Sequence, residues 1–130
     1  MKEVFITGAS TGIGYALTES FLKRGDFVWA GVRKPEVLSD LQAKYPDLLK
    51  VLKLDVTSAT DIAAAAKVVS EKKIFAPFIL INNAGVANGG PLESLPLTEW
   101  KNLFDVNVLG LVAVTQAFLP RIRQSQGRIL

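Results

Sequence analysis

The stretch TGASTGIG, residues Thr7–Gly14, decides the fold of this chain. It follows an apolar run, Glu3–Thr7, that is typical of a short buried strand. After it, Ile13, Leu17 and Phe21 recur at the spacing of one face of a helix. The stretch is therefore predicted to be a turn that leads from a strand into a helix.

Three glycines, Gly8, Gly12 and Gly14, lie in this turn. Glycine allows a positive φ, and its missing Cβ lets a ligand approach the backbone closely. The helix start that follows has unpaired N–H groups and the positive end of the helix dipole, which favours a pyrophosphate as ligand. The spacing G-x-x-x-G-x-G differs from the common G-x-G-x-x-G dinucleotide fingerprint. From the turn alone, a glycine-rich loop that binds nothing stays an open alternative.

Composition bounds the class of protein. A length of 130 residues corresponds to about one domain, and 49% hydrophobic residues indicate strands buried on both faces. There is no cysteine and no histidine, which excludes thiolate chemistry and removes the usual general base; we expect no metal site. The net charge is +3, and the only basic cluster is Arg121, Arg123 and Arg128, so we expect no nucleic-acid partner.

No membrane segment is predicted either. The longest apolar segment, Val108–Leu119, is shorter than the roughly 20 residues that span a bilayer, and it contains Gly110, Thr115 and Gln116. The start of the chain does not resemble a signal peptide. We therefore expect a cytoplasmic protein.

Strand and helix patterns alternate along the chain. After the first strand and helix, the predicted elements are a strand at Asp26–Arg33, a helix at Glu36–Lys44, a strand at Leu48–Leu54, a helix capped by Ser58 or Thr60, a strand at Pro77–Asn82, a long helix from Thr98 that bends or ends near Pro120, and an incomplete strand at 127–130.

This order predicts an α/β fold, a Rossmann-type doubly wound parallel sheet with strand order 3-2-1-4-5, cut within the fifth strand. Residues 1–130 would form one dinucleotide-binding domain, and an incomplete one. Ligands bind such sheets at the carboxyl ends of the strands where the order reverses. That crevice lies between TGASTGIG and the turn that follows Ile81, so both turns should face one site.

Four motifs together resemble the short-chain dehydrogenase/reductase family of NAD(P)-dependent oxidoreductases. They are Thr7–Gly14, Asp55-Val56, Asn82-Asn83-Ala84-Gly85, and Asn107. The resemblance covers the whole chain, but only about the first half of a typical member. It implies an oxidoreductase that acts on a small-molecule alcohol or carbonyl substrate.

The resemblance assigns roles to individual residues. Contacts with the cofactor's phosphates and ribose would come from Gly8, Ser10, Gly12, Ile13 and Gly14. Asp55 would bind the adenine amino group, and Val56 would lie against the ring. Asn82, Asn83, Ala84 and Gly85 would pin the central strand and border the adenosine ribose. Asn107 would hold a water molecule of the catalytic proton relay and kink the long helix.

Structural alternatives remain open for three of these residues. Asp55 could cap the next helix, and Asn83 could bond only to backbone groups, as could its neighbour Asn82. Asn107 could be a polar residue on a helix flank.

The end of the second strand selects between NAD and NADP. A carboxylate there would bind the ribose 2′-hydroxyl and repel a 2′-phosphate. Here Val32 is followed by Arg33 and Lys34, and a guanidinium can bind phosphate in bidentate fashion. We therefore predict NADP over NAD, although Thr11 stands where NADP-preferring members often have a second basic residue. Arg33 could instead be a solvated charge at a strand end.

The chain departs from the family in its catalytic residues. The family's reaction uses a tyrosine, a lysine four residues later, and an upstream serine. Tyr15 is followed by Glu19 at that spacing and Tyr45 by Leu49, so neither tyrosine fits. The sequence thus favours an NADP(H)-dependent oxidoreductase whose chain is truncated. The alternative is a non-catalytic nucleotide-binding or interaction module. In either case we expect a homo-oligomer formed through the long helix, residues 98–123.

Overall fold

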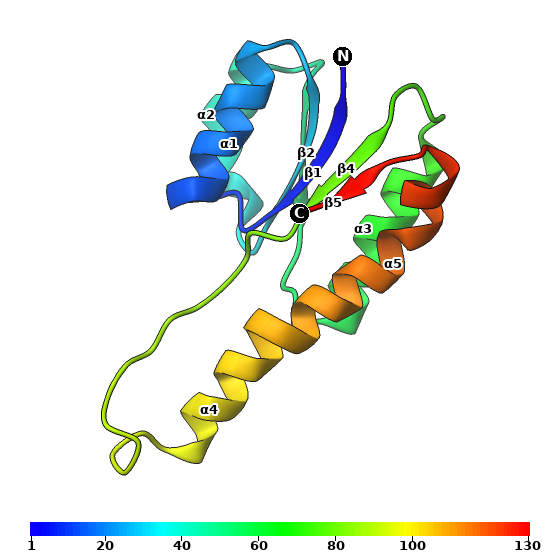
Figure 1. The fold of residues 1–130 in the computed structure, drawn as a ribbon. Coiled ribbons are helices and arrows are strands. Elements are labelled where there is room, and N and C mark those ends of the chain that lie inside the picture. The colour runs from blue at the N-terminus through cyan, green and yellow to red at the C-terminus, as the bar shows by residue number, and fades with distance from the viewer.

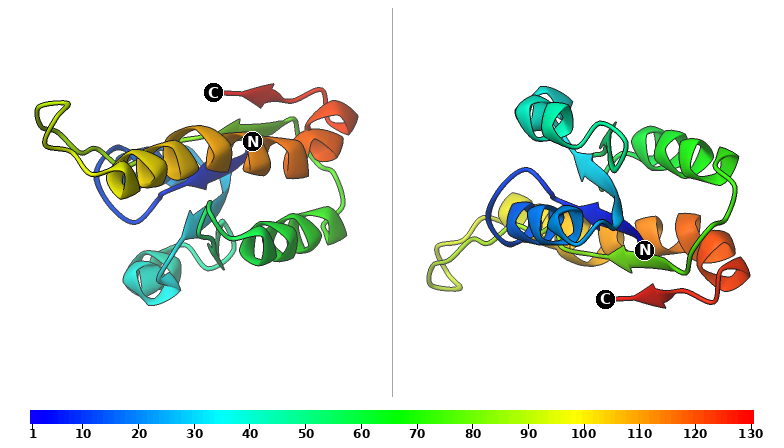
Figure 2. Two further views of the ribbon diagram at one scale, coloured as in Figure 1. Left: turned by 90° about the horizontal axis from the view of Figure 1, so that it is seen from below. Right: turned by 90° about the horizontal axis from the view of Figure 1, so that it is seen from above.

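The computed structural model describes all residues, Met1–Leu130, and contains one five-stranded parallel sheet of order β3-β2-β1-β4-β5 (Figure 1). This confirms the predicted fold class and strand order. The strands are β1 Glu3–Thr7, β2 Phe27–Val32, β3 Leu49–Lys53, β4 Phe78–Ile81 and β5 Arg128–Ile129. β5 pairs with β4 in the register Ile79↔Arg128 and lies at the outer edge of the sheet (Figure 2).

The helices follow the strands in the predicted alternation. They are α1 Gly12–Lys23, α2 Ser39–Lys44, α3 Ala59–Glu71, α4 Leu97–Phe104 and α5 Leu111–Gln124. A short 3₁₀ turn, Pro35–Leu38, precedes α2, so the predicted helix at Glu36–Lys44 begins with a tighter turn. A π-helical turn at Asp105–Gly110, called the π-turn below, joins α4 to α5.

Helices cover both faces of the sheet, and this explains the high apolar content. All five residues of β1 are buried, because alternate side chains enter two separate cores. Val4 and Ile6 pack with α1 and α2, whereas Phe5 packs against Phe118 of α5 with ring centroids 4.5 Å apart. Figure 1 shows α1 and α2 on one side of the sheet, and α3 and α5 on the other.

The long helix does not end at Pro120, which was one of the two alternatives expected there; the other, a bend, stays a prediction. It continues to Gln124, because Phe118 and Ile122 on either side of the proline are buried and hold the helix against the sheet. Proline has no N–H group, so the carbonyl of Gln116, one turn earlier, has no helical hydrogen-bond partner. Because Pro120 and Gln116 are both exposed, this carbonyl can bond to water.

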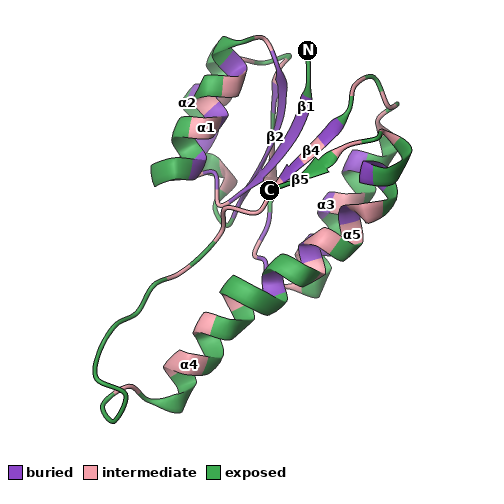
Figure 3. Ribbon diagram, viewed as in Figure 1, coloured by how far each residue is buried: buried purple, intermediate pink, exposed green.

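Helical structure is continuous from Leu97 to Gln124, a span of 28 residues. By length and composition this helix is long and apolar enough to cross a membrane. From the shorter apolar segment Val108–Leu119 alone, the sequence predicted no membrane span. The core helix of a soluble protein passes the same test. Here the α5 part packs on the sheet, whereas α4 projects away from it and is mostly exposed (Figure 3).

Candidate functional site

A cavity of about 420 Å³ lies at the carboxyl ends of β1 to β4. Its walls come from the glycine-rich turn after β1, the ends of β2 and β3, the turn after β4, and one side of α4 with the π-turn. This is the crevice where the strand order reverses, so the predicted location of the site agrees with the location of the cavity.

The glycine-rich turn forms one wall of this cavity. Gly8 has a φ of +65°, and a Cβ on it would come within 2.9 Å of the Cα of Ala84. Gly12 has a φ of +54°, but a Cβ on it would meet nothing within 4 Å. Gly8 is therefore required for its positive φ and because a side chain there would clash with Ala84. Gly12 is required for its positive φ alone, and it leaves open space at the start of α1.

The first turn of α1 is unpaired, in contrast to that of α3. The residue before α1, Thr11, makes no side-chain capping bond, and no acidic residue lies in the first turn. At α3, the Ser58 hydroxyl accepts a bond from the amide of Asp61, whose carboxylate also lies in that first turn. The free N–H groups of α1 thus remain available to an anion, and a pyrophosphate fits this open, positive helix end.

A clasp of hydrogen bonds ties the glycine-rich turn to the turn after β4. Asn83 donates through Nδ2 to the carbonyls of Thr7 and Gly8, both at 3.0 Å. The Thr7 hydroxyl in turn accepts from the amides of Asn83 and Ala84, at 3.0 and 2.9 Å. A Cβ on Gly14 would overlap Asn83, which fixes α1 against this clasp. The side chain of Asn83 therefore bonds only to backbone carbonyls, and in doing so it shapes the cavity.

The neighbouring asparagines have similar positioning contacts. Asn82 donates to the Thr115 hydroxyl of α5 at 3.2 Å. Asn107, within the π-turn, accepts from the amide of Val86 and donates to the Val86 carbonyl, both at 2.8 Å. This pair of bonds holds the start of the β4–α4 loop against the helix. The π-helical turn, Asp105–Gly110, contains the residue where the family resemblance implies a kink.

Asp55 is oriented by the residue two positions later. The Thr57 hydroxyl and amide donate to the same carboxylate oxygen of Asp55, at 2.7 and 2.9 Å. These bonds hold the pKa of Asp55 below its ordinary value, and the positive charges of Arg33 and Lys53 add to the effect. The helix cap of α3 is Ser58, so Asp55 is free to offer its second oxygen to a ligand.

Arg33 follows directly on β2 at the rim of the cavity, and its side chain is exposed. Val32 before it also lines the cavity, and no carboxylate of β2 lies there. The end of β2 therefore offers a cation to a ligand, whereas the carboxylate in this part of the cavity, that of Asp55, lies after β3.

The structure brings most of the predicted site residues together. Those that line the cavity are Gly8, Ser10, Ile13, Arg33, Asp55, Val56, Asn83, Ala84 and Gly85. The remaining four, Gly12, Gly14, Asn82 and Asn107, do not line it. Three of those have the packing or hydrogen-bonding contacts described above, and Gly12 adjoins open space.

Sequence reasoning missed five residues that line the cavity, Leu54, Thr57, Val86, Asn102 and Val106. Three of them carried a usable signal. Thr57 stands two residues after Asp55, the spacing of an Asx turn. Asn102 and Val106 are four residues apart, so they lie on one face of a helix.

Comparisons with known proteins agree with this geometry. The family model for short chain dehydrogenases matches residues 2–130. The NADPH-dependent 3-dehydrocapnine reductase of Ornithobacterium rhinotracheale is 37% identical over 92% of this chain and 42% of its own length. The mitochondrial D-beta-hydroxybutyrate dehydrogenase of Bos taurus is 33% identical over 99% of this chain and 40% of its own length.

Solved structures give the same result. A short-chain dehydrogenase from Streptomyces avermitilis has a TM-score of 0.90 with 34% identity, and the match covers 99% of this chain and 48% of that one. An NADPH-bound carbonyl reductase from chicken fatty liver has a TM-score of 0.84 with 31% identity, covering 92% and 51%. This chain belongs to the short chain dehydrogenase family, and it spans about half the length of these relatives.

Proposed function

We propose that this chain binds NADP(H) for an oxidoreductase that interconverts an alcohol and a carbonyl compound. The observation that carries the proposal is the cavity at the strand ends, with the unpaired start of α1 on one wall and Arg33 at its rim. Bound NADP(H) would supply or accept the hydride. Family membership favours this function over a non-catalytic module.

The chain's own residues would each contact a different part of the cofactor. The N–H groups at the start of α1 would receive the pyrophosphate, and the Arg33 guanidinium the 2′-phosphate. Asp55, kept ionised by Thr57, would accept a hydrogen bond from the adenine amino group, with Val56 against the ring. The relatives that use NADPH or are NADPH-bound support the choice of NADP over NAD.

The proton-transfer part of the reaction is not accounted for by these residues. Neither Tyr15 nor Tyr45 has a lysine four residues later, and the chain has no histidine or cysteine. We propose that Asn107 contributes to the proton relay of the complete enzyme, and that the proton donor itself lies outside this chain. The substrate pocket would lie outside it as well.

The test of this function is the cofactor preference of Arg33 variants. Arg33→Ala should weaken NADPH binding by roughly 1–3 kcal/mol, as expected for a charge-assisted contact, and should change NADH binding little. Lys34→Ala, which removes the adjacent exposed charge, is the matched control and should leave both affinities nearly unchanged. Equal losses for NADPH and NADH in a fluorescence titration would contradict the proposed contact.

We also propose that the protein is a cytoplasmic homo-oligomer that associates through its long helix. Phe104, Val108, Leu109, Leu111 and Val112 are large, exposed apolar residues on this helix, and a second copy could cover them. Light scattering should then report more than one chain per particle, and Leu109→Glu should reduce that number. A monomer at all protein concentrations would contradict the association.

A further inference from the structure

Gly110 is a buried glycine inside a helix, and its backbone conformation does not explain it. Its φ of −62° and ψ of −43° are ordinary helical values that any residue adopts. Glycine in a helix interior is less favourable than alanine, because the glycine backbone is more flexible in the unfolded chain and loses more conformational entropy on folding. A reason for glycine at this position must therefore come from its surroundings.

Those surroundings leave no room for a side chain. A Cβ on Gly110 would lie 2.8 Å from Cγ2 of Val56 and 2.9 Å from the carbonyl oxygen of Val56. It would also lie 3.0 Å from the carbonyl oxygen of Asp105, at the start of the same π-turn. Two of these three neighbours are backbone atoms, which cannot move away by changing a rotamer.

The π-turn contacts two walls of the cavity, the wall at the end of β3 and the wall after β4. On one side Gly110 packs against Val56, which follows Asp55 at the end of β3 and lines the cavity. On the other side Asn107 is bonded to both backbone groups of Val86, and a Cβ on Gly85 would come within 3.2 Å of the Asn107 side chain. The π-turn therefore connects the wall at the end of β3 with the wall after β4.

We propose that Gly110 is a positioning residue of the nucleotide site, which sets the distance between the Asp55–Val56 segment and the π-turn. The absence of a side chain lets the π-turn contact Val56 directly, so that Val106 and the Asn107–Val86 bonds keep a fixed place opposite Asp55. The inference rests on the proposed function, because the ligand is the adenosine part of NADP(H).

The test is the affinity of Gly110→Ala for adenosine 2′,5′-bisphosphate and for NADP⁺, measured by calorimetry on the protein as it is encoded. We expect both dissociation constants to rise about tenfold or more, because an added methyl group forces the two walls apart. Gly89→Ala is the matched control, since a Cβ there meets nothing within 4 Å, and its affinities should match those of the wild type. Thermal unfolding reports separately whether the variant is folded.

The outcomes distinguish a failure of the positioning role of Gly110 from a failure of the proposed function. If the wild type binds both ligands and folded Gly110→Ala binds them equally well, the positioning role is wrong and the proposed function stands. If the wild type binds neither ligand, the proposed function itself fails.

If Gly110→Ala does not fold, the double variant Val56→Ala/Gly110→Ala, which lacks the nearest side-chain atom, is compared with Val56→Ala. Weaker binding by the folded double variant would support the positioning role, and equal binding would overturn it. Failure of the double variant to fold would also overturn it, because Gly110 would then be required by the fold and not by the site.

Discussion

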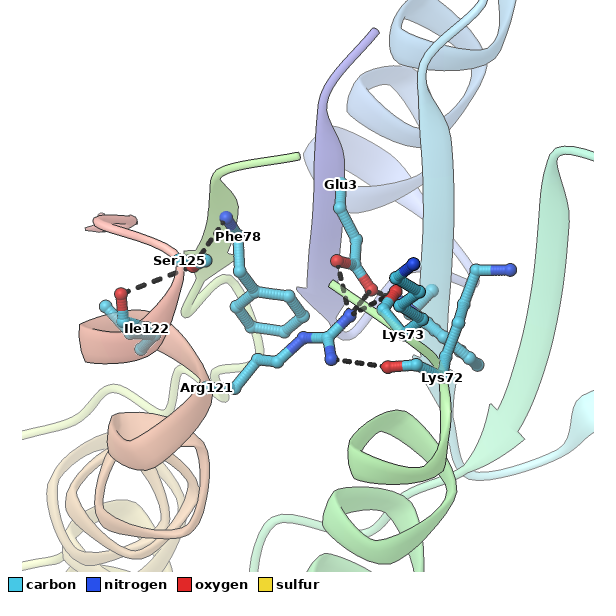
Figure 4. A network of polar contacts seen from close by, with 8 residues as sticks. Glu3, Lys72, Lys73, Phe78, Arg121, Ile122 and Ser125 are labelled. Carbon is cyan, nitrogen blue, oxygen red and sulfur yellow. Dashed lines mark hydrogen bonds and ion pairs between the residues drawn. The ribbon is translucent and has the colours of Figure 1, made fainter. Parts of the chain in front are cut away.

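At the amino ends of the strands, the carboxylate of Glu3 is fully buried and paired, whereas at the carboxyl ends the residues after β1 line an open cavity. Arg121 of α5 donates through Nη2 to both oxygens of Glu3, at 2.9 and 2.8 Å (Figure 4). Its Nη1 donates to the carbonyl of Lys72 at 2.6 Å, and Trp29 donates to Glu3 at 2.9 Å. This network joins β1, β2, α5 and the segment after α3.

The carboxyl ends are held by bonds of a different kind. Asn83, Thr7 and Asn107 bond mainly to backbone groups and have no buried charge among them. These bonds shape the turns and leave the cavity between them open. The comparison indicates that the amino end of the sheet contributes only to stability, whereas the carboxyl end also forms the cavity. Variants at the carboxyl end should therefore change binding, and variants at the amino end should not.

The largest effect on stability is expected at the amino end. Arg121→Ala should lower the free energy of unfolding by about 3–5 kcal/mol, because it leaves the buried Glu3 carboxylate without its cation. The affinity of the folded variant for NADPH should be unchanged. Urea unfolding and a ligand titration measure the two quantities, with the exposed Arg123→Ala as control. A loss of affinity as large as the loss of stability would contradict the separation.

At the carboxyl end, Asn83→Ala should affect both properties. It removes the donors to the carbonyls of Thr7 and Gly8, which should cost about 2–3 kcal/mol of unfolding free energy. The glycine-rich turn then loses its support, so NADPH affinity should fall as well. Asn88→Ala removes an exposed side chain from the same loop and is the control. Unchanged affinity would show that the turn keeps its shape without the clasp.

A pair of glycines with the same backbone strain gives the sharpest comparison. Gly12 and Gly25 have φ values of +54° and +78°, and a Cβ on either would meet nothing within 4 Å. Valine at each position should cost about 1–2 kcal/mol of unfolding free energy because of the left-handed conformation. Only Gly12→Val should lose NADPH binding, with the circular dichroism spectrum largely kept. Equal affinities for the two variants would make the turn purely structural.

The smallest effect is expected for Thr57→Val, and it depends on pH. The pKa of Asp55 is lowered in the folded protein, chiefly by the Thr57 hydroxyl, so the stabilisation is present above the ordinary carboxyl pKa. It is lost as the pH falls through the lower, folded-state pKa. Since Asp55 is partly exposed, the variant should lose less than about 1 kcal/mol of unfolding free energy near pH 7.

Urea unfolding of wild type and Thr57→Val at several pH values measures this difference. It should shrink as the pH falls below the ordinary carboxyl pKa of about 4 and toward the lower pKa of folded Asp55. Thr60→Val, at an exposed site in the first turn of α3, is the control. A difference that stays constant down to acid pH would mean that Thr57 does not act through the Asp55 carboxylate.

The sequence predicted most of the fold, because its strands are short apolar runs and glycine or proline marks several of their ends. The β2 prediction, Asp26–Arg33, exceeds the observed Phe27–Val32 by one residue at each end, as hydrogen-bonded pairing stops before the polar residues. An end of the long helix at Pro120, one of the two predicted alternatives, was wrong, because proline usually ends a helix and the burial of the residues around it is not visible as a local pattern. Ser58 was one of two predicted caps, and the structure selects it.

Sequence by itself determined the order of the elements and the composition of the glycine-rich turn, because backbone conformation and apolar periodicity act over a few neighbouring residues. Tertiary structure decided the contacts that join distant segments. Glu3 and Arg121 are 118 positions apart in the sequence, and Asn107 and Val86 are 21 positions apart. Gly110 packs against Val56, and no local sequence pattern predicts this contact. These contacts depend on how helices pack over the sheet, and packing is set by the whole chain at once.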